Sequence, residues 1–375
     1  MKLLILQEKL KKALKTIERV SPRSLTLPIL NNVLIQTEKN FLKLSTTDLE
    51  LGVNYWLLSK IEKQGQVVVP VSIVSNFLNF LPNKQVLLQK KENNLIIECD
   101  KYKTEIKGFL PDDFPIIPNV PNENFIEIKS SLFCKGLEQV VDITSPSQSR
   151  PEISGVYLFL KGKELKLVAT DSFRLGEKTI FFEGINNNQE FSMILPQKTV
   201  KEIINIFGEQ ENNIKIYFSP NQIMVENKIK EIKHPEVQLI SKLIEGDYPN
   251  YQEIIPKKYA TQVLLNKNDF LNHLKTASFF VNKLNEIKIE IDPKRNNLTI
   301  SSQNPEVGNY SSVLNIKAKG APLEISFNYK FLIHGVSIIK TKEVLFELNK
   351  EEGPAILKPV GDNSFIYVVM PIRSS

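Results

Sequence analysis

Apolar and polar residues follow the same order three times along the chain. Each third opens with a short apolar stretch and continues with apolar residues at helical spacing, which predicts a strand and then an amphipathic helix. In the first third, Leu10, Leu14 and Ile17 would share one helix face. The predicted strand and helix pairs are residues 3–6 with 8–20, 125–128 with 131–143, and 262–265 with 267–281.

A predicted β-hairpin follows each of these helices. The paired segments are 32–36 with 41–45, 155–160 with 165–170, and 287–291 with 297–301. Each hairpin leads into a polar turn, at Asp48, Asp171 and Asn304. Asp48 and Asp171 are 123 residues apart, and Asn304 follows 133 residues later. This period is far too long for a solenoid repeat and suits a repeated domain.

A second strand and helix, and then three further strands, complete each third. The second helices are predicted at 72–81, 197–207 and 328–339, and most strands follow one another through hairpins. The fold class is therefore α+β, with two helices packed on antiparallel sheets in each of three copies. Proline-bearing loops at 113–115 and 247–249 predict domains at 1–120, 121–255 and 256–375.

Composition excludes several classes of protein. The chain has 375 residues, of which 42% are hydrophobic and 24% charged, as expected for a globular protein of two or three domains. We expect a cytoplasmic protein without membrane spans, because no apolar run approaches the roughly 18 residues that a span needs. Cys99 and Cys134 are the only cysteines, beside three histidines, so neither a disulfide framework nor an ordinary zinc site is predicted. No cofactor is expected. The net charge of +6 permits contact with nucleic acid without requiring it.

The turn aspartates are the one candidate for catalysis. Asp48 and Asp171 occupy equivalent turns of repeated domains, as the paired carboxylates of aspartic proteases do. That chemistry requires Asp-Thr-Gly or Asp-Ser-Gly, whereas this chain has Asp48-Leu49-Glu50 and Asp171-Ser172-Phe173. An aspartate after threonine at a strand end more often accepts hydrogen bonds from nearby backbone N–H groups. We therefore interpret both residues as structural and predict no enzyme.

Four motifs resemble a known family, the β subunit of bacterial DNA polymerase III, or β sliding clamp. They are the segment Leu-Pro-Ile-Leu at 27–30, the hairpin from Ser154-Gly155-Val156 to residues 167–175, the boundary at 246–251, and Tyr-Val-Val-Met-Pro-Ile-Arg at 367–373. The last is the most specific. The resemblance covers essentially the full length, and the triple repeat agrees with it. It implies three copies of a DNA-clamp domain and a head-to-tail dimer that forms a six-domain ring.

The resemblance also implies a function without catalysis. The ring would encircle duplex DNA and tether the replicative polymerase, with basic helix faces contacting phosphates without reading bases. The DNA-facing candidates are Lys9, Lys12, Lys15, Arg19, Arg23, Lys135, Lys198, Lys201, Lys267, Lys275 and Lys330. The helix predicted at 72–81 departs from this pattern, because it carries no lysine or arginine.

A pocket for short linear peptides is the second implied site. Its partners would be the polymerase III catalytic subunit, the clamp loader, other polymerases and repair proteins. By the matching motifs it is built from Ile153, Thr170, Phe173, Arg174, Leu175, Pro249, Ile254, Pro354, Val368, Val369, Met370, Pro371 and Ile372. We expect an apolar groove with a basic rim that suits a peptide with Leu and Phe anchors. The family commonly has Gly-His where this chain has Ser172-Phe173, and often a basic residue where it has Glu253, so we expect an altered peptide preference.

The homodimer seam is expected between the edge strand 104–109 of one copy and the third domain of the other. The candidate residues are Lys103, Ile106, Lys107, Phe109, Ser278, Phe279, Phe280 and Glu306. Glu306 is the only acid between residues 304 and 309, fewer than the family usually has at this place.

Two alternatives stay open. A duplicated ligand-binding or scaffold protein that never encircles DNA would be a monomer without salt-sensitive attraction to DNA, and it would leave the C-terminal motif unexplained. A hydrolase that uses Asp48 and Asp171 would lose activity when both are changed to Asn.

Overall fold

The computed structural model describes residues 1–22, 24–121, 124–147, 149–182, 190–229, 231–232, 234–349 and 353–372. They form two compact units. The first is built mainly from Met1–Lys135 and Lys198–Ile244, and the second from Gly136–Phe182, Asn187–Gln197 and Glu245–Ser375. Both units take part of the central third, so the predicted domain boundaries remain predictions. None of the helices in the described ranges is long and apolar enough to cross a membrane.

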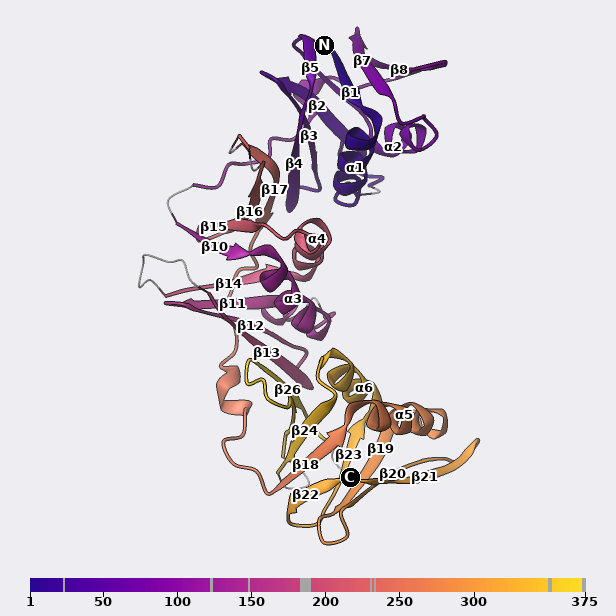
Figure 1. The fold of residues 1–375 in the computed structure, drawn as a ribbon, viewed down its shortest axis with the longest axis vertical. Helices are drawn as coiled ribbons and strands as arrows, with labels where there is room; N and C mark the ends of the chain where they lie inside the picture. The colour runs from indigo at the N-terminus through magenta and orange to yellow at the C-terminus, as the bar shows by residue number, and fades with distance from the viewer. Residues whose placement is uncertain are drawn as a thin grey trace. The chain divides into compact units, whose positions relative to one another are not determined.

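Two α-helices occur in each third, where the apolar periodicity predicts them (Figure 1). They are α1 Gln7–Glu18, α2 Val71–Asn79, α3 Ser130–Val140, α4 Gln197–Phe207, α5 Lys267–Ala277 and α6 Tyr329–Ile338. Two predicted helices were too long, because their last turns tighten into the 3₁₀ helices η3 (Val141–Ile143) and η6 (Ser278–Phe280). On α1 the buried face consists of Gln7, Leu10, Ala13, Leu14 and Ile17.

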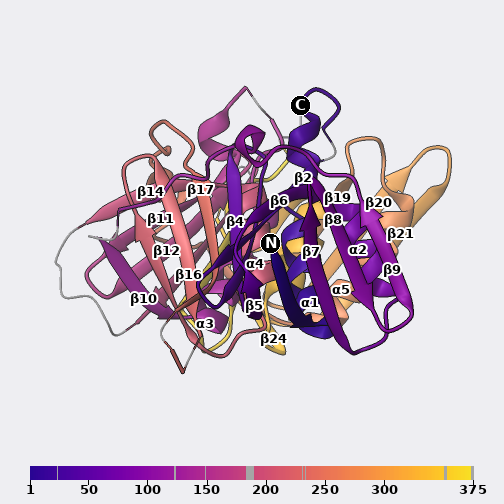
Figure 2. The ribbon, with the colours of Figure 1, turned by 90° about the horizontal axis from the view of Figure 1, so that it is seen from above.

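The first unit contains a five-stranded and an eight-stranded sheet, both antiparallel. Figure 2 shows β1, β7, β8 and β9 side by side in the smaller one. Its order is β5 (Lys60–Lys63), β1 (Lys2–Leu6), β7 (Gln85–Lys91), β8 (Asn94–Cys99) and β9 (Tyr102–Ile106). The larger runs β10 (Phe125–Lys129), β15 (Asn213–Phe218), β16 (Gln222–Lys228), β17 (Pro235–Lys242), β4 (Leu51–Leu58), β3 (Phe41–Thr47), β2 (Asn32–Glu38) and β6 (Gln66–Pro70).

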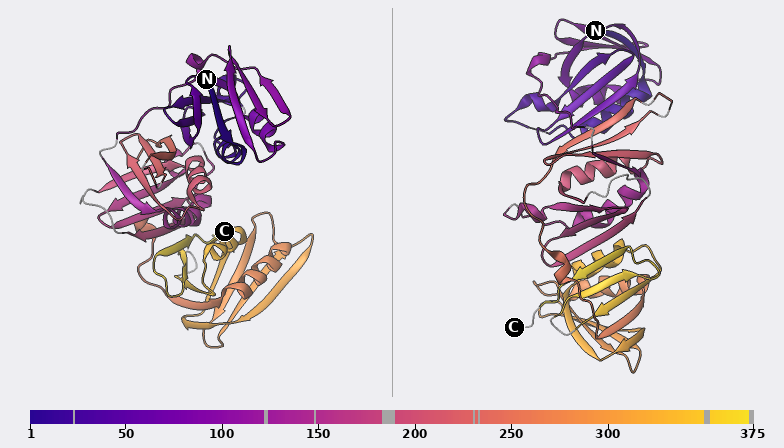
Figure 3. Two further views of the ribbon diagram at one scale, coloured as in Figure 1. Left: turned by 45° about the horizontal axis from the view of Figure 1, so that its top comes forward. Right: turned by 90° about the vertical axis from the view of Figure 1, so that its left-hand side faces the viewer.

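The second unit contains a nine-stranded and a four-stranded sheet. Helix α5 contacts β20 and β21 of the smaller one (Figure 3). Its order is β21 (Gly308–Asn315), β20 (Asn297–Asn304), β19 (Glu286–Asp292) and β23 (Leu323–Asn328). The larger runs β14 (Phe191–Pro196), β11 (Gly155–Lys161), β12 (Glu164–Thr170), β13 (Arg174–Phe181), β26 (Phe365–Val369), β25 (Ala355–Pro359), β24 (Glu343–Leu348), β18 (Thr261–Asn266) and β22 (Lys317–Gly320).

Both large sheets join strands of two successive thirds. Strand β4 of the first third pairs with β17 of the second, and β13 of the second pairs with β26 of the third. Strands β4 and β21 were not predicted, and of β13 only the end was, as an extended segment at residues 179–182. Seven of the eight residues of β4 are buried, so the alternation that marks a half-buried strand is missing.

The turns at Asp48 and Asp171 have the same geometry. The Oδ1 atom of Asp48 accepts the N–H groups of Glu50 and Leu51, and that of Asp171 accepts those of Phe173 and Arg174. Both aspartates therefore accept backbone hydrogen bonds within their own turns, as the sequence predicts. The residue after each aspartate has a positive φ, 77° at Leu49 and 78° at Ser172. A side chain in this left-handed conformation costs roughly 1–2 kcal/mol, a penalty that glycine avoids.

The turn geometry predicts that Leu49→Gly stabilises the protein. The Leu49 side chain is 46% exposed, so its loss removes little packing, while the strain at φ 77° is relieved. We expect the free energy of unfolding to rise by about 1 kcal/mol, measured from denaturant midpoints. Leu58→Gly is the matched control. Leu58 is 59% exposed at the end of β4, and it is not one of the residues with a positive φ. Equal loss of stability in both variants would contradict the prediction.

Candidate functional site

The second turn brings the C-terminal segment against Phe173. Strand β13 pairs with β26 in the register Arg174 to Val369 and Leu175 to Val368. The pairing continues past the strand end, where the Met370 N–H donates to the Phe173 carbonyl oxygen at 2.8 Å. Two residues later, the Ile372 N–H donates to the Ser326 carbonyl of β23, also at 2.8 Å. The backbone of the C-terminal segment is thus held at both ends.

A cavity of about 510 Å³ lies beside this segment. It is lined by Ser172, Phe173, Leu284, Asn328, Phe331, Met370, Pro371 and Ile372. Phe173, Met370, Pro371 and Ile372 belong to the predicted peptide pocket. Leu284, Asn328 and Phe331 were missed, because they come from the start of α6 and the loop before β19, which only tertiary structure brings to the turn.

The Arg174 side chain, predicted for the basic rim, is engaged by other groups of the protein. Its Nε donates to Oδ2 of Asp171 at 2.8 Å, and its Nη2 donates to the Asp142 carbonyl at 3.0 Å. The guanidinium also lies 4.9 Å from the ring centroid of Phe331, and the side chain is 15% exposed. This charge is neutralised by Asp171 and holds the turn and the aromatic ring in place.

Five predicted pocket residues lie beneath the surface. Ile153, Thr170, Leu175, Val368 and Val369 are each less than 9% exposed. Leu175 and Val368 pack in a buried cluster with Val168, Tyr251 and Ile356. Thr170 donates its hydroxyl to the Arg174 carbonyl at 2.8 Å. These residues therefore build the support for the turn and strand pair.

The remaining predicted pocket residues lie on loops. Pro249 is half-buried and Ile254 is 45% exposed; they flank Tyr251, whose hydroxyl donates to Glu177 at 2.6 Å. Burial, and then the Glu177 carboxylate, raise the pKa of Tyr251. Pro354 is half-buried directly before β25. None of the three lines the cavity described above.

His334 is half-buried on α6, one turn after Phe331. Its Nδ1 atom has no hydrogen-bond partner among the described residues. Burial, and then Arg174, lower the pKa of His334 to about 4, against the opposing effects of Asp142 and Asp171. The imidazole beside the candidate site is therefore neutral near pH 7.

This shift predicts acid sensitivity. Between the ordinary histidine pKa of about 6.5 and the folded value of about 4, the unfolded chain binds a proton that the folded chain does not. The histidine's contribution to the free energy of unfolding is thus present above about pH 6.5 and is lost towards pH 4. We expect His334→Gln to flatten the pH dependence of the denaturant midpoint in this window, with no change of slope above about pH 7. Identical curves for both proteins would argue against it.

Four basic residues form one exposed face of α1. Lys9, Lys12, Lys15 and Arg19 are all exposed, opposite the buried Leu10, Leu14 and Ile17. Lys135 on α3, Lys201 on α4, Lys275 on α5 and Lys330 on α6 are exposed as well. Arg23 lies outside the described residues. Helix α2 and the residue that follows it expose apolar side chains instead, with Ile73 52% and Phe80 81% exposed.

Two predicted DNA-facing lysines have partners within the protein. Lys198 forms an ion pair with Asp48. Lys267 donates to the carbonyl groups of Ser337, at 3.2 Å, and Ile339, where α6 ends. A cation at this position is stabilised by the helix dipole. Burial, and then Lys340, lower the pKa of Lys267. We therefore assign both lysines to structural contacts.

The expected seam residues lie on or beside two edge strands. Among the described strands, β9 pairs only with β8, and β21 only with β20. Lys107 is exposed, and Lys103 forms an ion pair with Glu98. Ile106 is 6% exposed at the end of β9, and its place in the seam stays a prediction. The Phe109 N–H donates to the Val68 carbonyl, which covers part of the edge of β6.

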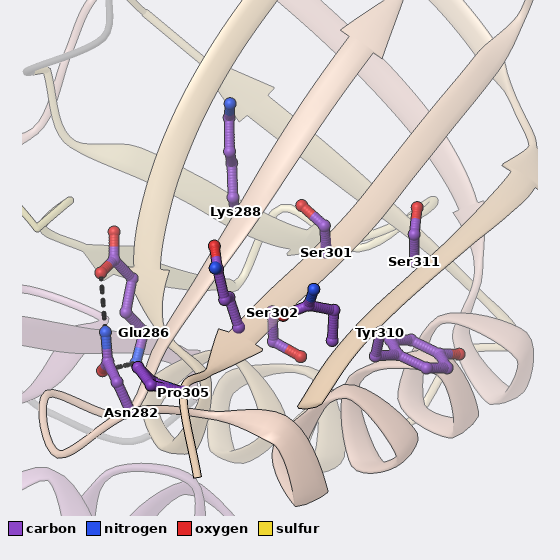
Figure 4. A pocket seen from close by; sticks show the side chains of 10 residues that line it. Asn282, Glu286, Lys288, Ser301, Ser302, Pro305, Tyr310 and Ser311 are labelled. Carbon is purple, nitrogen blue, oxygen red and sulfur yellow. Dashed lines mark hydrogen bonds between the residues drawn. The ribbon is translucent and has the colours of Figure 1, made fainter. Parts of the chain in front are cut away.

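The residues beside β21 are aromatic and polar. Phe279 of η6 is 73% exposed, and Phe280 stacks on Tyr310 with ring centroids 5.9 Å apart. Ser278 donates its hydroxyl to the Lys275 carbonyl, and Glu306 is exposed in the turn before β21. Figure 4 shows a neighbouring polar cavity of about 630 Å³, with Lys288, Ser301 and Ser311 on adjacent strands.

Three repeated α+β domains with strand-paired junctions define the class of protein as a DNA clamp. In the described ranges, no three His, Cys, Asp or Glu side chains gather as a metal site requires. The chain belongs to the DNA polymerase III beta subunit family. Its N-terminal domain matches residues 1–118, the central domain 127–250 and the C-terminal domain 252–373. The resemblance to this family, predicted from the sequence motifs, is confirmed. The function of this family is that of a sliding clamp.

Named relatives and solved structures agree. The beta sliding clamp of Synechococcus elongatus is 26% identical over all of this chain and 99% of its own length. That of Staphylococcus aureus is 28% identical over 96% of this chain and 95% of its own. The DNA polymerase III subunit beta of Pseudomonas aeruginosa has a TM-score of 0.94 at 24% identity, and the Bacillus subtilis sliding clamp 0.94 at 22%. Both structures cover the whole of each chain, which establishes the fold.

Proposed function

We propose that two copies of this chain close into a ring around duplex DNA and tether a replicative polymerase to it. The observation that carries the proposal is the pairing rule at the domain junctions. In each third, a first run of three consecutively paired strands follows the first helix (β2–β4, β11–β13 and β19–β21), before the one or two strands that lead to the second helix. A second run of three strands follows the second helix (β7–β9, β15–β17 and β24–β26). At both junctions the last strand of a first run pairs with the last strand of a second run, as β4 does with β17 and β13 with β26.

Under this rule only β21 and β9 lack a partner. Strand β21 ends the first run of the last third, and β9 ends the second run of the first third. Both are edge strands among the described residues. Exposed edges invite pairing with another chain, and the same antiparallel junction between two copies would satisfy them. Because the contact is head-to-tail, a ring results if the rotation closes.

The DNA contact proposed for the ring is electrostatic. The face of α1 offers Lys9, Lys12, Lys15 and Arg19, to which the exposed lysines of the later helices add. Such contacts bind phosphates without sequence preference, which allows sliding. The ring would act by topology, so we infer a non-enzymatic, cytoplasmic replication protein. The scaffold that never encircles DNA is the competing function, and the hydrolase is disfavoured because Asp48 and Asp171 serve their own turns.

The proposed peptide site lies at the second turn. Its cavity is apolar, and the Met370–Ile372 backbone beside it is fixed by the Phe173 and Ser326 carbonyls. An extended peptide with apolar anchors suits such a preformed groove. We propose that polymerases, the clamp loader and repair proteins use it, the polymerase III catalytic subunit among them.

The pairing rule predicts a dimer that depends on the seam. Light scattering across a dilution series should give twice the chain mass, and Phe279→Asp should shift dissociation to higher protein concentration, because a charge would be buried against β9. Phe181→Asp is the control, since Phe181 is 68% exposed at the end of β13. A wild-type monomer at micromolar concentration would favour the scaffold instead.

The α1 face predicts the salt dependence of DNA association. Replacing Lys9, Lys12 and Lys15 with alanine should lower the slope of log K against log salt concentration by about 2.7, at about 0.9 for each lost phosphate contact. The control replaces Lys39, Lys60 and Lys91, which are equally exposed but lie on strands and turns. Equal slopes for the two triple variants would refute a DNA-facing α1.

A further inference from the structure

We propose that the cavity beside Phe173 takes an aromatic side chain of the bound peptide, which stacks on the Phe173 ring. The proposal rests on the peptide-binding function proposed above and names the chemistry of the residue that enters. It follows from three features of the cavity: an exposed aromatic wall, a lining without charge, and a preorganised backbone.

The aromatic wall consists of Phe173 and Phe331. Their ring centroids are 6.3 Å apart and their planes differ by 21°, an offset stacked arrangement. Phe331 is held by the guanidinium of Arg174, 4.9 Å from its centroid. Phe173 itself is 62% exposed, so most of its surface stays open to a ligand. Exposed apolar surface beside a cavity marks an interaction site, and a planar ring covers it best.

The lining carries no charged side chain. Its polar groups are the Ser172 hydroxyl, which accepts a hydrogen bond from Arg150 at 3.0 Å, and the Asn328 side chain, whose oxygen caps α6 at the Lys330 N–H. Two cations lie close by, and both are paired: Arg150 with Glu152 and Arg174 with Asp171. Met370 adds a thioether, which makes favourable contacts with aromatic rings. An uncharged aromatic group therefore fits better than a charged one.

The position of Phe173 is fixed before any ligand arrives. Its N–H donates to Asp171 Oδ1 at 3.0 Å, and its carbonyl accepts the Met370 N–H at 2.8 Å. The conformational entropy of this backbone is thus already lost, which leaves more of the stacking energy for binding. The cavity of about 510 Å³ has the size of an ordinary ligand pocket.

The first test compares side chains within one peptide. An extended peptide with Leu and Phe anchors receives Tyr, Leu or Gln at each remaining position in turn, and binding is measured by fluorescence anisotropy. At one position Tyr should bind about 2- to 12-fold more tightly than Leu or Gln, the range for one aromatic pair. Phe173→Ala should abolish this advantage, whereas Phe181→Ala, a control at another exposed phenylalanine, should retain it. An advantage that persists in Phe173→Ala, or none at any position, overturns the proposal.

The second test probes the cavity without a peptide. The chain has four methionines, and only Met370 lines this cavity. With ¹³C-methyl methionine, N-acetyl-tyrosinamide should shift the Met370 signal through its ring current and leave Met193 and Met224 unchanged. N-acetyl-leucinamide should cause no such shift, and Phe173→Ala should remove the response. A Met370 shift without peptide binding would refute the peptide site while supporting the aromatic cavity. Peptide binding without a Met370 shift would support the peptide site and refute the aromatic cavity.

Discussion

The antiparallel pairing of strands from neighbouring thirds is the constraint on which the rest of the structure depends. Neither half of a junction sheet is complete alone, because β4 and β13 would each expose a row of unpaired backbone groups. Pairing with β17 and β26 satisfies those groups and fixes the register of the strands that carry the turns. Other sheet edges are partly covered by hydrogen bonds within the chain. The Phe109 N–H donates to the Val68 carbonyl at one edge, and the Ile372 N–H donates to the Ser326 carbonyl at another.

The same pairing places the candidate peptide site. Because β26 ends opposite Arg174, the chain leaves the sheet at Met370, directly beside the turn that begins with Asp171. A polar turn and an apolar C-terminus thereby meet although they are far apart in the sequence. At the equivalent place in the first unit, the Lys242 N–H donates to the Glu50 carbonyl at 2.9 Å, and the Lys242 and Glu50 side chains form an ion pair. The repeat thus supplies one backbone geometry twice, and the side chains decide which copy offers an apolar groove.

Much of this architecture could be predicted from the sequence, and the failures have physical causes. Helix periodicity located all six helices of the described residues, since each buries one apolar face. Alternation found the hairpins but missed β4, which is buried nearly throughout. In the site, motif matching found Phe173 and Met370. It missed Leu284 and Phe331, which lie far from both in the sequence and reach the cavity only through tertiary structure. It also could not show that Arg174, Lys198 and Lys267 form ion pairs or hydrogen bonds with other groups of the protein.

The pairing of these charged side chains within the protein determines which basic residues are left to contact DNA. Lys198 and Lys267 stabilise a turn and a helix end, so the proposed attraction to DNA falls mainly on α1, where four basic residues are exposed on a single helix. A ring needs no tight contact with its substrate, because topology prevents escape and each phosphate contact can stay weak. The peptide site has the opposite requirement. Its partners must be held by contact alone, and there the chain places an uncharged, preformed aromatic surface.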